Sequence, residues 1–161
     1  MRDAHDVYAE TNPAFCSAVL VEFTKAYMSN RPEGPETPIA YLALPIALSG
    51  ELAGTFDRTN KNTGLLEWLE RSPQVQLGLA ERVNASLAIV SDAIRFGCFT
   101  RILVIEGGTH LRLGDRKLKP SAMKALGDEP GQAVKRAGRL GHWFASAGST
   151  RSAFDALGLT V

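Results

Sequence analysis

The stretch ILVIEGGTHLRL, residues 102–113, decides the fold class because it has the pattern of two short strands joined by a turn. Residues 102–106 are strand-like, with an apolar and largely β-branched run at 102–105, and residues 109–113 return as a second strand. Between them, Gly107 and Gly108 supply the positive φ angles that a two-residue turn demands. The sequence therefore predicts a β-hairpin here.

The turn also predicts how the two strands pair. With the turn centred on the glycine pair, Val104 would face Leu111, and Ile102 would face Leu113. Both pairs then lie on the same side of the ribbon, which is the arrangement that a half-buried hairpin needs.

A long helical pattern, residues 73–96, comes directly before the hairpin. Its apolar residues recur at spacings of four, four, three and four, as on one face of a helix. They are Leu79, Val83, Leu87, Val90 and Ile94. Gly97 is placed to end this helix. Because Val83 and Leu87 would face the core, a charge introduced at either position is expected to destroy folding.

Helices are also predicted towards both ends of the chain. An N-terminal helix at about 13–28 begins with Asn12, whose side chain suits the cap position, and with a proline in the first turn. C-terminal helices are predicted at about 131–158. In the first of these, the small residues Gly138 and Gly141 would let another element approach closely.

Two further segments lie between these helices. Residues 39–44 (IAYLAL) form either a short buried strand or the entrance to a helix, since periodicity cannot decide for so short a run. Pro45 then suits the first turn of a helix that reaches about Phe56. A short helix at 63–71 follows and stops near Pro73.

Helices followed by a two-stranded ribbon are the order of a winged helix, in which the hairpin is the wing. We therefore predict an α+β fold that is mostly helical, with a winged-helix-like core at about 39–114. Residues 39–44 would supply a short strand that pairs with the wing. Residues 1–161 are expected to form a single domain, because 161 residues with 45% hydrophobic content can bury one core.

Charge is distributed unevenly, although the net charge is only +1. Residues 1–100 hold eight Lys and Arg against twelve Asp and Glu, whereas residues 101–139 hold nine against four. Part of this excess forms a basic strip on and after the hairpin. The basic strip consists of Arg112, Arg116, Lys117 and Lys119. It is the candidate contact for an acidic protein surface or for nucleic acid, and a solvated loop without a partner is the alternative.

No motif for catalysis, cofactor binding or metal binding is found. The sequence contains neither a P-loop nor a GxSxG nucleophile motif. None of His5, His110 and His142 has the spacing of a metal site. Cys16 and Cys98 lie in apolar segments and are expected to be buried. The chain is therefore predicted not to be an enzyme, with no catalytic, cofactor-binding or metal-binding residues.

The pattern of apolar residues also predicts a location. The longest apolar run, residues 39–48, is too short to cross a bilayer. The first residues are polar and partly acidic, unlike the apolar stretch of a secretory signal. A cytoplasmic location is therefore expected.

Six short segments occur in the order found in a known family. They are NPAFC (12–16), LALPIAL (42–48), LEWL followed by SP (66–69 and 72–73), AIRFG (93–97), GRLGHWF (138–144) and FDALGL (154–159). In these motifs the sequence resembles the middle component of three-component ABC systems over nearly its whole length. It departs from the pattern after Leu48, where SGELAG (49–54) stands in place of a basic K-x-T-R type segment.

The resemblance implies an adaptor that bridges an SMC-like or ABC-type ATPase and a variable effector, often a nuclease. Such systems belong to the Lamassu-like group of bacterial anti-phage defence. The ATPase would sense foreign DNA, and the middle component would help to hold the effector inactive until then.

The residues alone leave open an alternative, a stand-alone winged-helix DNA-binding regulator. The basic strip favours it. The exposed face of the helix predicted at 73–96 is nearly neutral and argues against it, because neutralisation of phosphates supplies most non-specific DNA affinity.

Overall fold

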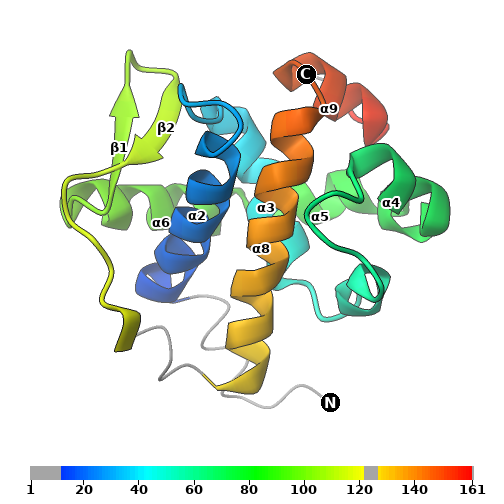
Figure 1. Cartoon of the computed structure of the whole chain (residues 1–161), viewed down its shortest axis with the longest axis horizontal. Coiled ribbons are helices and arrows are strands. Elements are labelled where there is room, and N and C mark those ends of the chain that lie inside the picture. The colour runs from blue at the N-terminus through cyan, green and yellow to red at the C-terminus, as the bar shows by residue number, and fades with distance from the viewer. Residues whose placement is uncertain (1–11, 122–126, 161) are drawn as a thin grey trace.

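Residues 12–121 and 127–160 are described by the computed structural model, and they are mostly helical with one small antiparallel hairpin (Figure 1). The α-helices of this part are α2 (Pro13–Met28), α3 (Thr37–Leu48), α4 (Leu65–Arg71), α5 (Leu79–Ala85), α6 (Leu87–Phe99), α8 (Asp128–Ser146) and α9 (Thr150–Ala156). The same part contains the 3₁₀ turns η1 (Ala53–Phe56) and η2 (Pro73–Gln76) and the strands β1 (Leu103–Glu106) and β2 (His110–Leu113). The predicted mostly helical α+β composition is confirmed, and His5 lies outside the described residues.

Helices α2 and α8 lie side by side at the centre of the molecule (Figure 1). As predicted, Asn12 caps α2, since its Oδ1 accepts hydrogen bonds from the backbone N–H groups of Ala14 and Phe15 at 2.9 and 3.3 Å. Gly141 permits the close approach of the two helices. A Cβ atom built there would collide with the carbonyl oxygen of Phe23 and lie 2.7 Å from the Cβ of Ala26.

An aromatic cluster joins α8 to α4 and η1. Phe56 and Trp143 stack with ring centroids 5.6 Å apart and an interplanar angle of 8°. Trp68 packs against both rings, at centroid distances of 5.1 and 5.3 Å. Its indole N–H donates to Thr55 Oγ1 at 3.1 Å. All three rings are buried, so this cluster is a central part of the core.

The hairpin forms where it was predicted, but its register is shifted by one residue. Leu103 pairs with Leu113, and the loop has three residues, 107–109, rather than two. The predicted pairing would have placed Leu103 and Leu111 on opposite faces of the ribbon. In the observed register both lie on the face that packs against the helices, where they are 1% and 0% exposed. Burial of two leucines therefore overrides the preferred turn length.

Residues 39–44 are the middle of α3 and not a strand, which corrects the predicted third strand of the sheet. The helix is apolar on nearly every side and buried, so its sequence has no clear period. Pro45 lies in its interior, and the helix ends at Leu48 instead of reaching Phe56. At its end the buried Arg136 donates from Nε to the carbonyl oxygen of Ala47 at 2.9 Å. Thus Arg136 satisfies one carbonyl that the end of α3 leaves without a helical partner.

The long helix predicted at 73–96 is also wrong, because η2, α5 and α6 take its place. Gly78 has a left-handed φ of 66° and separates η2 from α5, and Ser86 separates α5 from α6. The break changes the phase of the apolar face, so that Leu87 is 45% exposed. A charge at Leu87 is therefore no longer expected to unfold the chain.

Gly97 does not end the helix, since α6 continues to Phe99. A Cβ at position 97 would lie 2.7 Å from the Oγ of Ser17 and 2.5 Å from the Cδ1 of Leu103. The glycine therefore lets α6 pack against α2 and β1. The left-handed residue that follows the helix is Arg101, with a φ of 64°.

Candidate functional site

Three large apolar side chains stand out in solvent. Phe99 is 90% exposed, Leu77 is 76% exposed and Leu66 is 68% exposed. Phe99 is the last residue of α6, which contacts β1, whereas Leu66 belongs to α4 and Leu77 follows η2, which contacts α4. The hairpin and α4 lie at opposite ends of the longest axis of the molecule (Figure 1). The exposed apolar residues therefore mark two separate candidate surfaces.

The first surface, here called the hairpin end, consists of Phe99, the exposed side chains of β1 and the basic strip. Val104 and Ile105 of β1 are 43% and 39% exposed. The neighbouring Cys98 is half-buried, and burial raises the pKa of its thiol, while a backbone hydrogen bond from Ile105 opposes that shift. A protonated, partly covered thiol is a small apolar group and a poor nucleophile.

The basic strip is split by the structure into one paired and three unpaired cations. Arg112 lies on β2, where its guanidinium is 2.6 Å from Glu106. Arg116, Lys117 and Lys119 are exposed in the segment after β2, and no ion pair engages them within the described residues. The strip therefore offers three available positive charges beside the apolar residues of the hairpin end.

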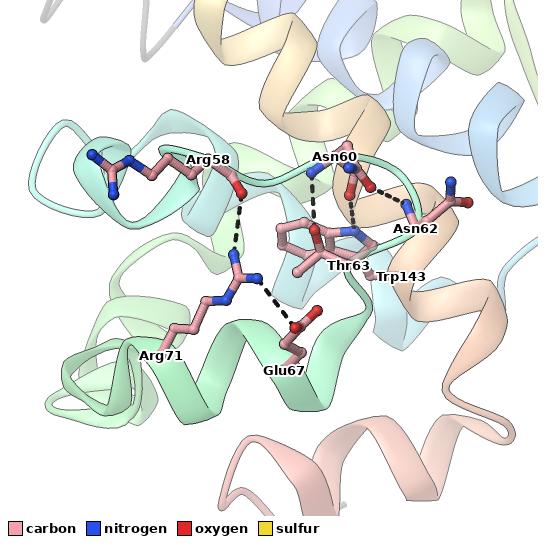
Figure 2. Close-up of polar contacts among 7 residues, drawn as sticks. All are labelled: Arg58, Asn60, Asn62, Thr63, Glu67, Arg71 and Trp143. Carbon is pink, nitrogen blue, oxygen red and sulfur yellow. Dashed lines mark hydrogen bonds and ion pairs between the residues drawn. The ribbon is translucent and has the colours of Figure 1, made fainter.

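The second surface, here called the α4 end, consists of residues 57–64, Leu66 and Leu77. Its loop is held by a network of hydrogen bonds (Figure 2). Trp143 Nε1 donates to the carbonyl oxygen of Asn60 at 2.8 Å. The Asn60 side chain accepts from the backbone N–H of Asn62 at 2.8 Å, and the Asn60 N–H donates to Thr63 Oγ1 at 2.9 Å.

Two arginines donate hydrogen bonds to the backbone at and just before the start of the same loop. Arg71 donates to the carbonyl oxygen of Arg58 at 3.1 Å and pairs with Glu67 at 3.1 Å (Figure 2). Arg139 donates to the carbonyl oxygen of Phe56 at 3.0 Å. Arg58 is held with a φ of 60°, which is uncommon for a residue with a side chain. The loop is thus exposed and ordered before any partner arrives, which lowers the entropy cost of binding.

The sequence analysis did not predict the α4 end, because residues 57–63 (DRTNKNT) have only the polar composition of a turn. The bonds of Asn60 and Thr63 are of the local side-chain-to-backbone kind typical of Asn and Thr in turns. The contacts from Trp143 and Arg139 arise more than 75 residues later in the chain and have no local signal.

Comparison with known families identifies the chain. The family described as ABC-three component (ABC-3C) system middle component 3 matches residues 2–161. The chain belongs to this family. No curated protein and no solved structure matches it. The resemblance inferred from six short motifs is therefore confirmed at the level of the family.

His142 and His110 both lie within hydrogen-bond distance of neighbouring side chains. His142 Nδ1 lies 3.2 Å from Asn30 Nδ2 and 3.4 Å from Ser29 Oγ, just after the end of α2. His110 Nδ1 lies 2.9 Å from Thr109 Oγ1 at the hairpin tip. Among residues 12–121 and 127–160, no cluster of His, Cys, Asp and Glu has an arrangement able to hold a metal ion. In the same residues, no helix combines the length and the hydropathy needed to span a bilayer.

Acidification is expected to destabilise the middle component through His142. Burial first, and then the charge of Lys61, lower the pKa of this histidine below 6.5 in the folded chain, and Glu22 opposes the shift. In the unfolded chain a histidine titrates near 6.5. As the pH falls below 6.5 towards the folded pKa, the unfolded state binds more protons, so the free energy of unfolding decreases.

Urea unfolding at pH 7.5 and at pH 5.5 measures this dependence. The His142→Gln variant should lose the histidine contribution, because glutamine does not titrate. The bond from the Asn30 amide supports the same direction, since its N–H group requires an unprotonated Nδ1 as acceptor. Identical pH dependence in the two proteins would contradict the expectation.

Proposed function

We propose that this middle component is a non-catalytic adaptor, acting in the cytoplasm, that bridges an SMC-like or ABC ATPase and an effector, often a nuclease. The complex would be a bacterial anti-phage defence system of the Lamassu-like group. The observation that carries the proposal is the presence of exposed apolar residues at two opposite ends of the molecule (Figure 1). A bridge needs two separated surfaces, whereas a protein with one partner needs a single surface.

Each end has properties that favour protein contacts. Phe99 exposes a whole aromatic ring at the hairpin end, and aromatic residues are enriched among the residues that dominate binding energy. At the α4 end, the exposed Leu66 follows closely after a loop that is already ordered, and the exposed Leu77 follows η2, which contacts α4. The hairpin would act as a wing-like docking element, although α3 takes the place of the third strand expected of a winged helix.

The stand-alone DNA-binding regulator is the second candidate, and the basic strip favours it. Only three of its cations are free of ion pairs in the described residues. Three phosphate contacts give a slope of log affinity against log salt of about −2.7, which is shallow compared with that of a specific DNA-binding protein. The strip is therefore better suited to an acidic protein surface.

A co-purification experiment tests the adaptor function. The chain is expressed with the two other components of its system and isolated through a tag. We expect Phe99→Ser to release one component and the double variant Leu66→Ser/Leu77→Ser to release the other. Leu87→Ser is the matched control, since Leu87 is 45% exposed but belongs to neither surface. Retention of both components by both variants would refute the two-surface adaptor.

Charge reversal tests the basic strip separately. The triple variant Arg116→Glu/Lys117→Glu/Lys119→Glu should fold normally, because all three side chains are exposed. We expect weaker assembly with the components at low salt and little change in duplex DNA binding by the isolated chain. Strong DNA binding by the unmodified chain alone, lost in the variant, would favour the regulator instead.

A further inference from the structure

The two edges of the hairpin have different surroundings. The outer edge of β2 is covered by the segment before α3, where the Leu111 N–H donates to the carbonyl oxygen of Pro35 at 2.8 Å. The Thr37 N–H also donates to the carbonyl oxygen of Thr109 at 2.9 Å. β1 is the other edge of the two-stranded sheet, and no strand of the described residues pairs with it there. The β2 edge is thus covered by a backbone segment, whereas the β1 edge has no strand beside it and is bordered by α6 through the bond from the Ile105 N–H to Cys98.

The pairing shows which backbone groups of β1 point into the open edge. Leu111 lies opposite Ile105, and its N–H points away from β1 towards Pro35. In an antiparallel pair, both residues of such a position direct their N–H and C=O groups outwards. The Gly114 N–H donates to the Ile102 carbonyl, so the backbone groups of residues 102 and 114 point towards each other. Inward and outward pairs alternate along the ribbon, which agrees with an outward-pointing pair at Ile105 and Leu111. The backbone of Ile105 therefore faces outwards, where it meets the Cys98 thiol, a weak hydrogen-bonding group.

The sequence of the β1 edge lacks residues that usually protect an edge strand, although β1 is only four residues long and Cys98 of α6 lies against Ile105. The sequence of β1, LVIE, contains no proline and no lysine. Its one charged residue, Glu106, is paired with Arg112 of β2. Val104, Ile105 and the nearby Phe99 add exposed apolar surface. An apolar edge without proline or lysine is a template for another strand, and the weak bond to the Cys98 thiol is the only cover of the Ile105 N–H that the described residues provide.

The positive charges of the basic strip indicate what kind of segment covers the edge of β1. The backbone N–H groups of Gly114 and Arg116 donate to the carbonyl oxygens of Ile102 and Arg101, so the chain leaving β2 passes beside the base of the hairpin. The three free cations of the basic strip are therefore near the end of β1 that is farther from the turn. A strand laid along β1 would have one terminus close to these charges, and acidic residues there would be attracted.

We propose that β1 accepts an extended segment of a partner component as a third strand, with apolar residues along β1 and acidic residues at the base of the hairpin. The Ile105 N–H would exchange its weak bond to the Cys98 thiol for a main-chain hydrogen bond to the partner, and contacts with Val104 and Phe99 would supply specificity. This proposal rests on the adaptor function and names how one of its two surfaces binds.

Hydrogen exchange and one pair of variants test the proposal in the assembled complex. Amide exchange in residues 103–106 should slow at least tenfold when the complex forms. Ile105→Pro removes the outward N–H and should reduce retention of one component more than tenfold. Ile105→Thr keeps the N–H and is a good strand former, so it should retain that component within about threefold. The charge-reversed strip variant should bind less well at 0.1 M salt and differ less from wild type at 0.5 M.

The outcomes separate this proposal from the adaptor function. If the wild-type chain retains both components but exchange in residues 103–106 is unchanged, strand addition is overturned and the adaptor stands. If the wild-type chain retains neither component, the adaptor itself is wrong. If the isolated chain forms a dimer that Ile105→Pro dissociates, the occupant is a second copy, and the partner segment is overturned. The exchange measurement remains decisive if Ile105→Pro disturbs the hairpin.

Discussion

Replacing Trp143 by alanine should lower the free energy of unfolding by about 3–5 kcal/mol. Trp143 is 1% exposed and stacks on Phe56 while packing against Trp68. Alanine would leave a cavity where three elements meet and would remove the donor that holds the carbonyl of Asn60. Because Asn60 belongs to the exposed loop of the α4 end, the variant should also increase protease cleavage within residues 57–64.

Urea unfolding followed by circular dichroism measures this loss, with Phe99→Ala as the control. Phe99 is aromatic but 90% exposed, so its removal should change stability by less than about 0.5 kcal/mol. Trp143→Phe keeps a ring and loses the indole N–H, and should fall between the two variants. If Trp143→Ala and Phe99→Ala have the same midpoint, the aromatic cluster does not stabilise the fold as described.

Gly141→Ala should destabilise the chain by about 1–3 kcal/mol, although alanine is the better helix former. The added Cβ would collide with the carbonyl oxygen of Phe23 and lie 2.7 Å from the Cβ of Ala26. Since those atoms belong to the α2 helix, relief requires α2 and α8 to move apart. Thermal unfolding measures the effect as a lower melting temperature.

Gly138→Ala is the matched control, one turn earlier on the same helix. A Cβ at this position meets only the side chain of Glu22, at 3.7 Å, which is an ordinary contact. The variant should gain about 0.5–1 kcal/mol from helix propensity. A lower free energy of unfolding for Gly141→Ala and a higher one for Gly138→Ala would establish that close helix packing, and not helix propensity, requires glycine at position 141. A loss of equal size in both would show that the close approach is misplaced.

The sequence-based predictions succeeded where neighbouring residues decide the structure. The capping bond of Asn12 and the positive φ angles of Gly107 and Gly108 depend on atoms within three residues. They failed for the helix predicted at 73–96, because its apolar spacing continues across Gly78 and Ser86. Spacing alone does not reveal that the chain changes direction at these two residues.

The candidate surfaces were only partly predictable. The basic strip was recognised from charge, yet the pairing of Arg112 with Glu106 reduces its free cations to three in the described residues. The exposure of Phe99 and Leu66 could not be predicted, since an isolated apolar residue in a helix is normally counted as core. The open edge of β1 required the register and the contact of β2 with Pro35.

Local chemistry and the order of short motifs were sufficient to place the start of α2 and the position of the hairpin and to identify the family. The register of the hairpin, the helical state of residues 39–44 and the separation of two exposed ends were set by packing. Burial depends on which distant residues, such as Trp143 and Asn60, come together in space. That information belongs to the folded chain as a whole and has no counterpart in the spacing of neighbouring residues.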